Sequence, residues 1–229
     1  FLSLFLIYYI RFLGVCRLYL YYTTPETVPV FEPNQKKYTK EFYQYIQDAL
    51  DLIELANGSP ESKWGSIRCR MGHPASFNLK MLGIGNEQWE QSSVDYFRRY
   101  KVFETEIHNI YPNIKLIFSA GPNPDGEEFD AAWNWIECVC CNNDNFTYAV
   151  DEHFYRAPEW FLDNAGRYDK YERNIKVFAG EYAAHTKLTK NPMQKNNLEA
   201  ALAEAAFMTG MEKMPMLCVW QHTRRYWQR

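Results

Sequence analysis

Apolar residues along positions 38–212 follow two alternating spacings, and these predict helices and strands in turn. Apolar side chains at helical spacing predict helices near residues 42–56, 94–110, 127–140, 158–171 and 198–208. Short continuous apolar runs predict buried strands at residues 79–85, 114–120, 148–153 and 176–179. Alternation of strands and helices at this spacing is typical of a parallel sheet, so we expect an α/β fold.

Two architectures contain such a sheet, the doubly wound fold and the (β/α)8 TIM barrel. No glycine-rich phosphate-binding motif follows a predicted strand, which disfavours a nucleotide-binding fold. The active site of a TIM barrel forms at the C-terminal ends of its strands. Because Glu87, His153 and Glu181 all lie at such predicted ends, we expect a TIM barrel, as one domain over residues 1–229.

Two of these residues, Glu87 and Glu181, are the strongest candidates for chemistry. Each follows a glycine where an apolar run ends. Burial of an ionised carboxylate is costly, so a carboxylate at a buried strand end calls for a reason. Retaining glycosidases use two carboxyl groups about 5–5.5 Å apart, one as acid/base and one as nucleophile. The two glutamates are therefore predicted to be such a pair.

Composition narrows the remaining possibilities. A chain of 229 residues with 47% hydrophobic content can form a sizeable core. The net charge of −3 gives no electrostatic reason to expect nucleic acid or an anionic membrane as a partner. Arg11 and Arg17 interrupt the apolar N-terminal stretch, so we expect no membrane helix there. The six cysteines are interpreted as buried or free thiols rather than a disulfide framework.

Three motifs in order resemble those of a known family. They are Gly85-Asn86-Glu87 followed by Trp89, then Asp151-Glu152-His153-Phe154-Tyr155, then Gly180-Glu181-Tyr182-Ala183. In this order, and with similar text between them, they resemble glycoside hydrolase family 51, the clan A α-L-arabinofuranosidases. The resemblance extends from about residue 38 to residue 212, and it implies a TIM-barrel catalytic domain.

The resemblance also implies a role for each candidate residue. Glu87 would be the general acid/base and Glu181 the nucleophile. Asn86 would hydrogen-bond the sugar 2-hydroxyl, a contact that strengthens in the transition state. Tyr155 would hydrogen-bond the nucleophile and hold it in position, and His153 would help to shape the same wall.

Several of these roles have a simpler alternative. Trp89 and Trp160 would line the sugar cleft, but ordinary packing would explain them equally well. Asn86 could cap the turn that follows its strand. His153 could be a core histidine with its hydrogen bonds satisfied.

The activity implied is that of a retaining, exo-acting α-L-arabinofuranosidase. It would release terminal non-reducing arabinofuranosyl residues from arabinan or arabinoxylan, without a metal or cofactor. The expected partner is an arabinose-containing oligo- or polysaccharide, with a homo-oligomer in the full-length protein. We favour a cytoplasmic or periplasmic location over secretion. The alternatives are another clan A retaining glycosidase, such as an endo-glucanase or xylosidase, and an inactive carbohydrate-binding fragment.

Both ends of the chain, residues 1–24 and 213–229, depart from the family pattern. The family continues after Glu212 with Asn-Ala-Asp-Val-Val, and one choice of codons for residues 213–228 gives that text when it is read in another frame. We therefore hypothesise a frameshift near Lys213. The first barrel strands and a C-terminal β-sandwich domain are expected to be missing, which predicts an incomplete barrel that is inactive alone.

Overall fold

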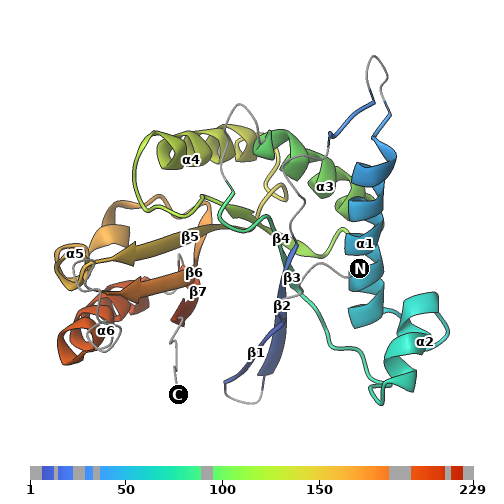
Figure 1. The fold of residues 1–229 in the computed structure, drawn as a ribbon, viewed down its shortest axis with the longest axis horizontal. Helices are drawn as coiled ribbons and strands as arrows, with labels where there is room; N and C mark the ends of the chain where they lie inside the picture. Colours follow the sequence, from blue (N-terminus) through green and yellow to red (C-terminus); the bar gives the residue numbers. More distant parts are fainter. Residues whose placement is uncertain are drawn as a thin grey trace. The chain divides into compact units, whose positions relative to one another are not determined.

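The structure, a computed structural model, describes most of the chain in two compact units. The described residues are 7–12, 15–22, 29–32, 37–88, 95–185, 197–214 and 218–223. The first unit comprises residues 1–118 and the second residues 119–229. Both units contain parallel strands, as the alternation of apolar runs predicts (Figure 1).

The sheet of the first unit has the strand order β1-β2-β3-β4. Its strands are β1 (Ile7–Phe12), β2 (Val15–Tyr22), β3 (Met81–Ile84) and β4 (Lys115–Ser119). β1 runs antiparallel to β2, whereas β2, β3 and β4 are parallel. The apolar N-terminal stretch thus forms strands. None of the helices within the described ranges combines the length and the apolar character that a membrane span needs.

Three helices accompany this sheet, namely α1 (Lys40–Asn57), α2 (Lys63–Arg70) and α3 (Tyr96–Ile110). Thr39 caps α1, because its hydroxyl accepts a hydrogen bond from the amide of Phe42. Phe42 then packs edge-to-face on Phe103 of α3, with ring centroids 5.6 Å apart. The apolar faces of α1 and α3 therefore form the core of this unit, and both helices agree with the sequence prediction.

Helix α2 was not predicted from the sequence. Its N-terminus is capped by Ser62, whose hydroxyl accepts from the amide of Gly65. Arg68 is buried and donates hydrogen bonds to the carbonyls of Leu55, His73 and Pro74. A short helix held by a buried arginine has no apolar stripe, so periodicity could not detect it.

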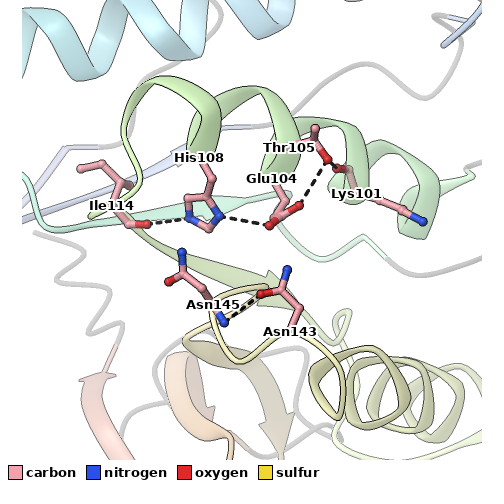
Figure 2. Close-up of polar contacts among 7 residues, drawn as sticks. All are labelled: Lys101, Glu104, Thr105, His108, Ile114, Asn143 and Asn145. Carbon is pink, nitrogen blue, oxygen red and sulfur yellow. Dashed lines mark hydrogen bonds and ion pairs between the residues drawn. The ribbon is translucent and has the colours of Figure 1, made fainter.

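The C-terminal end of α3 is fastened to the start of β4 through His108. One ring nitrogen, Nδ1, lies 3.1 Å from a carboxylate oxygen of Glu104, and Nε2 lies 2.9 Å from the carbonyl oxygen of Ile114 (Figure 2). Both nitrogens therefore face acceptors, which favours the imidazolium form. Accordingly, the pKa of His108 is raised, chiefly by the hydrogen bond to Glu104.

The second unit contains three parallel strands in the order β5-β6-β7. These are β5 (Ala149–Arg156), β6 (Lys176–Ala184) and β7 (Cys218–Thr223). The helices are α4 (Glu127–Cys140), α5 (Pro158–Asp163), the 3-10 turn η1 (Arg167–Lys170) and α6 (Leu198–Glu212). After α4 the chain turns at Asn143, whose side-chain oxygen accepts from the amide of Asn145 (Figure 2).

The core of the second unit lies where α5 and α6 pack on β5 and β6. Phe154 and Tyr182 stack with centroids 5.4 Å apart, and Phe207 of α6 packs against both rings. Gly210 lets α6 come close to the segment between α5 and η1, because a Cβ there would lie 1.7 Å from the carbonyl oxygen of Ala165. This apolar core covers one face of β5 and β6 and leaves the opposite face of β5 to polar side chains.

Candidate functional site

Glu87 is held in a tight turn at the C-terminal end of β3. The turn begins with Gly85, whose φ of +87° and lack of a side chain are both required, since a Cβ would lie 2.7 Å from the Tyr96 ring. The Tyr96 hydroxyl donates a 2.6 Å hydrogen bond to the carbonyl of Ile84. Glu87 itself has a φ of +54°, a conformation that costs a non-glycine residue about 1–2 kcal/mol. Such strain is concentrated at functional sites.

The neighbours of Glu87 in the predicted motif are placed only in part. Asn86 lies in the same turn and is partly buried, beside the partly buried Glu87. Its predicted contact with a sugar hydroxyl stays a prediction, as does the alternative of a turn cap. Trp89 lies outside the described residues.

Glu181 lies within a strand and not at its end. The sequence predicted that Glu181 and His153 end their strands, but β6 continues to Ala184 and β5 to Arg156. That prediction was wrong because buried or half-buried residues follow each polar position and keep the strands paired. His153 and Glu181 are direct partners across β5 and β6.

The alternating residues Asp151, His153 and Tyr155 share one face of β5. The Tyr155 hydroxyl donates a 2.8 Å hydrogen bond to Oε2 of Glu181, which is the contact that the sequence predicted. Asp151 lies 3.1 Å from Nε2 of His153 through Oδ2, and its Oδ1 accepts from the amide of Gly180 at 3.0 Å. Glu181 is 5% exposed, so this face gathers buried polar groups around one carboxylate.

The opposite face of β5 carries a second buried carboxylate, Glu152, which sequence reasoning gave no role. Its side chain is 0% exposed. Oε1 accepts from Nε1 of Trp133 and the hydroxyl of Tyr171, each at 3.0 Å. Oε2 accepts from the hydroxyl of Tyr168 at 2.9 Å and from Nε of Arg167 at 3.3 Å. The signal was present in the motif itself, since alternation along a strand separates Glu152 from Asp151 and His153.

Burial and the charge of Glu152 together set the protonation of its neighbours. Burial raises the pKa values of Tyr168 and Tyr171, and the carboxylate raises them further, so both phenols stay neutral donors. Burial lowers the pKa of Arg167, but Glu152 together with Tyr171 and Tyr168 more than offsets this, so the pKa is raised and the guanidinium stays charged. Burial, assisted by Glu152, also raises the pKa of Cys218 to about 12.

Trp160, predicted to line a sugar cleft, packs against core residues. Its ring lies 5.6 Å from Phe154 and 5.8 Å from Phe207, measured between centroids. The Arg167 guanidinium lies 5.8 Å from its centre. These contacts give Trp160 a structural role in the second unit, and a role toward a sugar stays a prediction.

Known proteins similar to this chain are α-L-arabinofuranosidases. An extracellular exo-α-L-arabinofuranosidase of Streptomyces chartreusis is 44% identical over 171 residues, which are 74% of this chain and 19% of that protein. The α-L-arabinofuranosidase 2 of Arabidopsis thaliana is 35% identical over 79% of this chain and 24% of its own length. The chain therefore spans about a fifth to a quarter of these two relatives.

Solved structures agree on the fold. An arabinose-bound GH51 α-L-arabinofuranosidase superposes with a TM-score of 0.60 and 27% identity, over 83% of this chain and 30% of that chain. An α-L-arabinofuranosidase of Thermotoga maritima gives the same TM-score at 15% identity, which bears on the fold alone. These neighbours are TIM-barrel enzymes, so the predicted fold class, part of a (β/α)8 barrel, is confirmed.

The sequence model of the family described as "Alpha-L-arabinofuranosidase 1 domain" matches residues 21–173, which are more than half of the chain. The match includes the turn that holds Glu87 and the whole of β5 with Asp151, His153 and Tyr155. The chain belongs to the α-L-arabinofuranosidase 1 domain family.

Proposed function

We propose that the protein containing this chain is a retaining, exo-acting α-L-arabinofuranosidase. Its substrate class is terminal α-L-arabinofuranosyl groups of arabinan or arabinoxylan. The observation that carries the proposal is a buried glutamate, Glu181, held by the Tyr155 hydroxyl in a chain of this family. The similarity to the Streptomyces relative, an exo-α-L-arabinofuranosidase, supports the substrate class.

In the proposed reaction Glu181 is the nucleophile and Glu87 the general acid/base. Glu181 attacks the anomeric carbon while Glu87 gives its proton to the departing glycosidic oxygen, and a covalent glycosyl-enzyme forms. Glu87 then takes a proton from water, which attacks the same carbon and releases arabinose with retained configuration. The Tyr155 hydrogen bond fixes the orientation of the Glu181 carboxylate, which reduces the entropy lost on reaching the transition state.

The remaining predicted ligands belong to this proposal as well. Asn86 lies between Gly85 and Glu87, which both have positive φ, and it would contact the sugar 2-hydroxyl through a hydrogen bond that strengthens in the transition state. His153 is Glu181's partner across the strands and would form part of the same wall. In this proposal the reaction needs no metal or cofactor, and the protein assembles into a homo-oligomer.

The test is hydrolysis of 4-nitrophenyl α-L-arabinofuranoside by the protein that contains this chain. Glu181→Gln and Glu87→Gln are each expected to lower kcat by at least about 1000-fold, since each removes an essential step. Exposed Glu159 supplies the matched control, and Glu159→Gln should retain the parent rate. Hydrolysis by Glu181→Gln at a rate near that of the parent would exclude the proposed nucleophile.

The same assay separates the alternative activities. Turnover of 4-nitrophenyl β-D-xyloside or β-D-glucoside with no turnover of the arabinofuranoside would point to another clan A glycosidase. Calorimetric binding of arabino-oligosaccharides without turnover of any of the three substrates would indicate a carbohydrate-binding protein. Either result would replace the proposed function.

A further inference from the structure

The pairing of β5 with β6 contains an extra residue just before Glu181. Asp151 pairs with Phe178 and His153 pairs with Glu181, so Glu152 alone on β5 faces both Ala179 and Gly180 on β6. This is a β-bulge in β6, a feature that re-aims the side chains that follow it. It lies just before Glu181, the side chain whose direction matters for the proposed reaction.

The bulge decides which face of the sheet Glu181 occupies. Without the extra residue, Gly180 would pair with His153 and Glu181 would pair with Phe154, because a shift of one residue moves a side chain to the other face. Phe154 is in the apolar core with Tyr182 and Phe207. The bulge therefore places the carboxylate opposite His153 and within reach of Tyr155 instead of in that core.

Asp151 makes the bulge possible. A bulge interrupts the regular ladder of backbone hydrogen bonds, and a buried amide without an acceptor costs about 1–3 kcal/mol. The amide of Gly180 finds its acceptor in Oδ1 of Asp151 at 3.0 Å. Asp151 is 2% exposed, so water does not compete for this contact.

The second oxygen of Asp151 acts on His153. Oδ2 lies 3.1 Å from Nε2 of His153, and a carboxylate can only accept from that nitrogen. Nε2 must therefore carry a proton, which fixes the orientation of the ring that faces Glu181. One buried carboxylate thus determines both the backbone before Glu181 and the state of its partner across the strands.

We propose that Asp151 is a positioning residue that holds the β6 bulge and the protonated Nε2 of His153, and so sets the face and orientation of Glu181. The catalytic part of this statement rests on the proposed function, in which Glu181 is the nucleophile. The structural part does not, so the two can be tested separately.

The first measurement uses the unaltered 229-residue chain. Nitrogen-15 NMR of the histidine rings, with the His153 signal assigned by its loss in His153→Gln, should show a proton on Nε2. Hydrogen exchange should show a protected Gly180 amide. An unprotonated Nε2, or a Gly180 amide that exchanges as fast as in an unfolded chain, would overturn the proposal without any variant.

Two variants then separate the contacts of Asp151. Asp151→Asn keeps one oxygen for Gly180 but can turn an NH2 group toward His153, and it should move the ring proton to Nδ1. Asp151→Ala should speed exchange of the Gly180 amide by at least about 10-fold. Asp125→Asn is the matched control, because Asp125 is exposed and pairs with Arg156, and both readouts should stay at their parent values.

The catalytic part is measured by the rate at which an arabinofuranose-configured epoxide esterifies Glu181, followed by mass spectrometry. Asp151→Asn should slow labelling by about 100-fold, the cost of a misplaced nucleophile. Labelling at the parent rate would overturn the positioning role. If the NMR results hold and the protein that contains this chain is never labelled, the proposed function fails while Asp151 keeps its role in holding the bulge.

Discussion

Replacement of Glu152 by glutamine should destabilise the second unit strongly, although the two side chains have nearly the same shape. The carboxylate accepts four hydrogen bonds, two on each oxygen. An amide retains one oxygen and turns a donor toward the two donors on the other side. Trp133 with Tyr171, or Tyr168 with Arg167, would then lack an acceptor.

Two routes give the magnitude. Two buried donors without acceptors cost about 2–6 kcal/mol together, at about 1–3 kcal/mol each. Removal of one partner from a buried ion pair costs about 3–5 kcal/mol. Arg167 and Glu152 are such a pair, with side chains 13% and 0% exposed. We therefore expect Glu152→Gln to lower the free energy of unfolding by about 3–5 kcal/mol, a large part of the usual 5–15 kcal/mol.

The assay is urea unfolding of the 229-residue chain, followed by tryptophan fluorescence, since Trp133 reports on the site directly. Glu159→Gln makes the same chemical change on an exposed face of α5 and should change the unfolding free energy by less than about 0.5 kcal/mol. A loss below about 1 kcal/mol for Glu152→Gln would refute the reasoning. It would mean that the four donors find other acceptors at little cost.

Three other predictions concern stability. The pKa of His108 is raised in the folded state, so the stability that His108 contributes is fully present below the ordinary histidine pKa near 6.5 and is lost as pH rises through the pKa of the folded state. Urea unfolding at several pH values should show this loss of stability, and His108→Gln should abolish the pH dependence. Gly210→Ala should cost about 2 kcal/mol in the same assay, because the new methyl meets the Ala165 carbonyl and the clash exceeds the gain in helix propensity of about 1 kcal/mol; an unchanged midpoint would contradict the close approach. The pKa values of Tyr168 and Tyr171 are raised in the folded state, so the stability that these two phenols give is present below pH about 10 and is lost above it, where the phenols of the unfolded chain ionise. Absorbance at 295 nm should show that the two tyrosines ionise only when the chain unfolds.

Long periodic segments were predicted well from the sequence. The residues predicted for α4 agree with its bounds, and α1 and α3 differ only near their ends, because each has an apolar stripe at helical spacing. The short helix α2 was missed because a buried Arg68 and a Ser62 cap hold it in place of an apolar face. The spacing of apolar residues therefore predicts only those helices that have an apolar face of their own.

One contact of the candidate site was predicted correctly from the sequence, whereas the bounds of its strands were not. Tyr155 and Glu181 were paired correctly because the motifs resemble a family. The ends of β5 and β6 were misplaced because the polar residues His153 and Glu181 look like strand ends until their buried surroundings are known. No sequence pattern shows a β-bulge at Gly180, since the bulge exists only in the pairing of two distant strands. The rest of the site therefore had to come from the tertiary structure.

The two faces of β5 carry different polar groups, and this has a consequence for how the gene can change. A substitution in β5 affects one face, either the side of Asp151 and Tyr155 or the side of Glu152. A deletion or insertion of a single codon there would exchange the faces, placing Glu152 on the side of Tyr155, away from its donors, and an acid without partners in the core. Point mutations in this strand can be selected one at a time, whereas changes in its length would be eliminated at once. Length variation among natural variants should therefore fall in segments such as the turn at Asn143 and leave β5 unaltered.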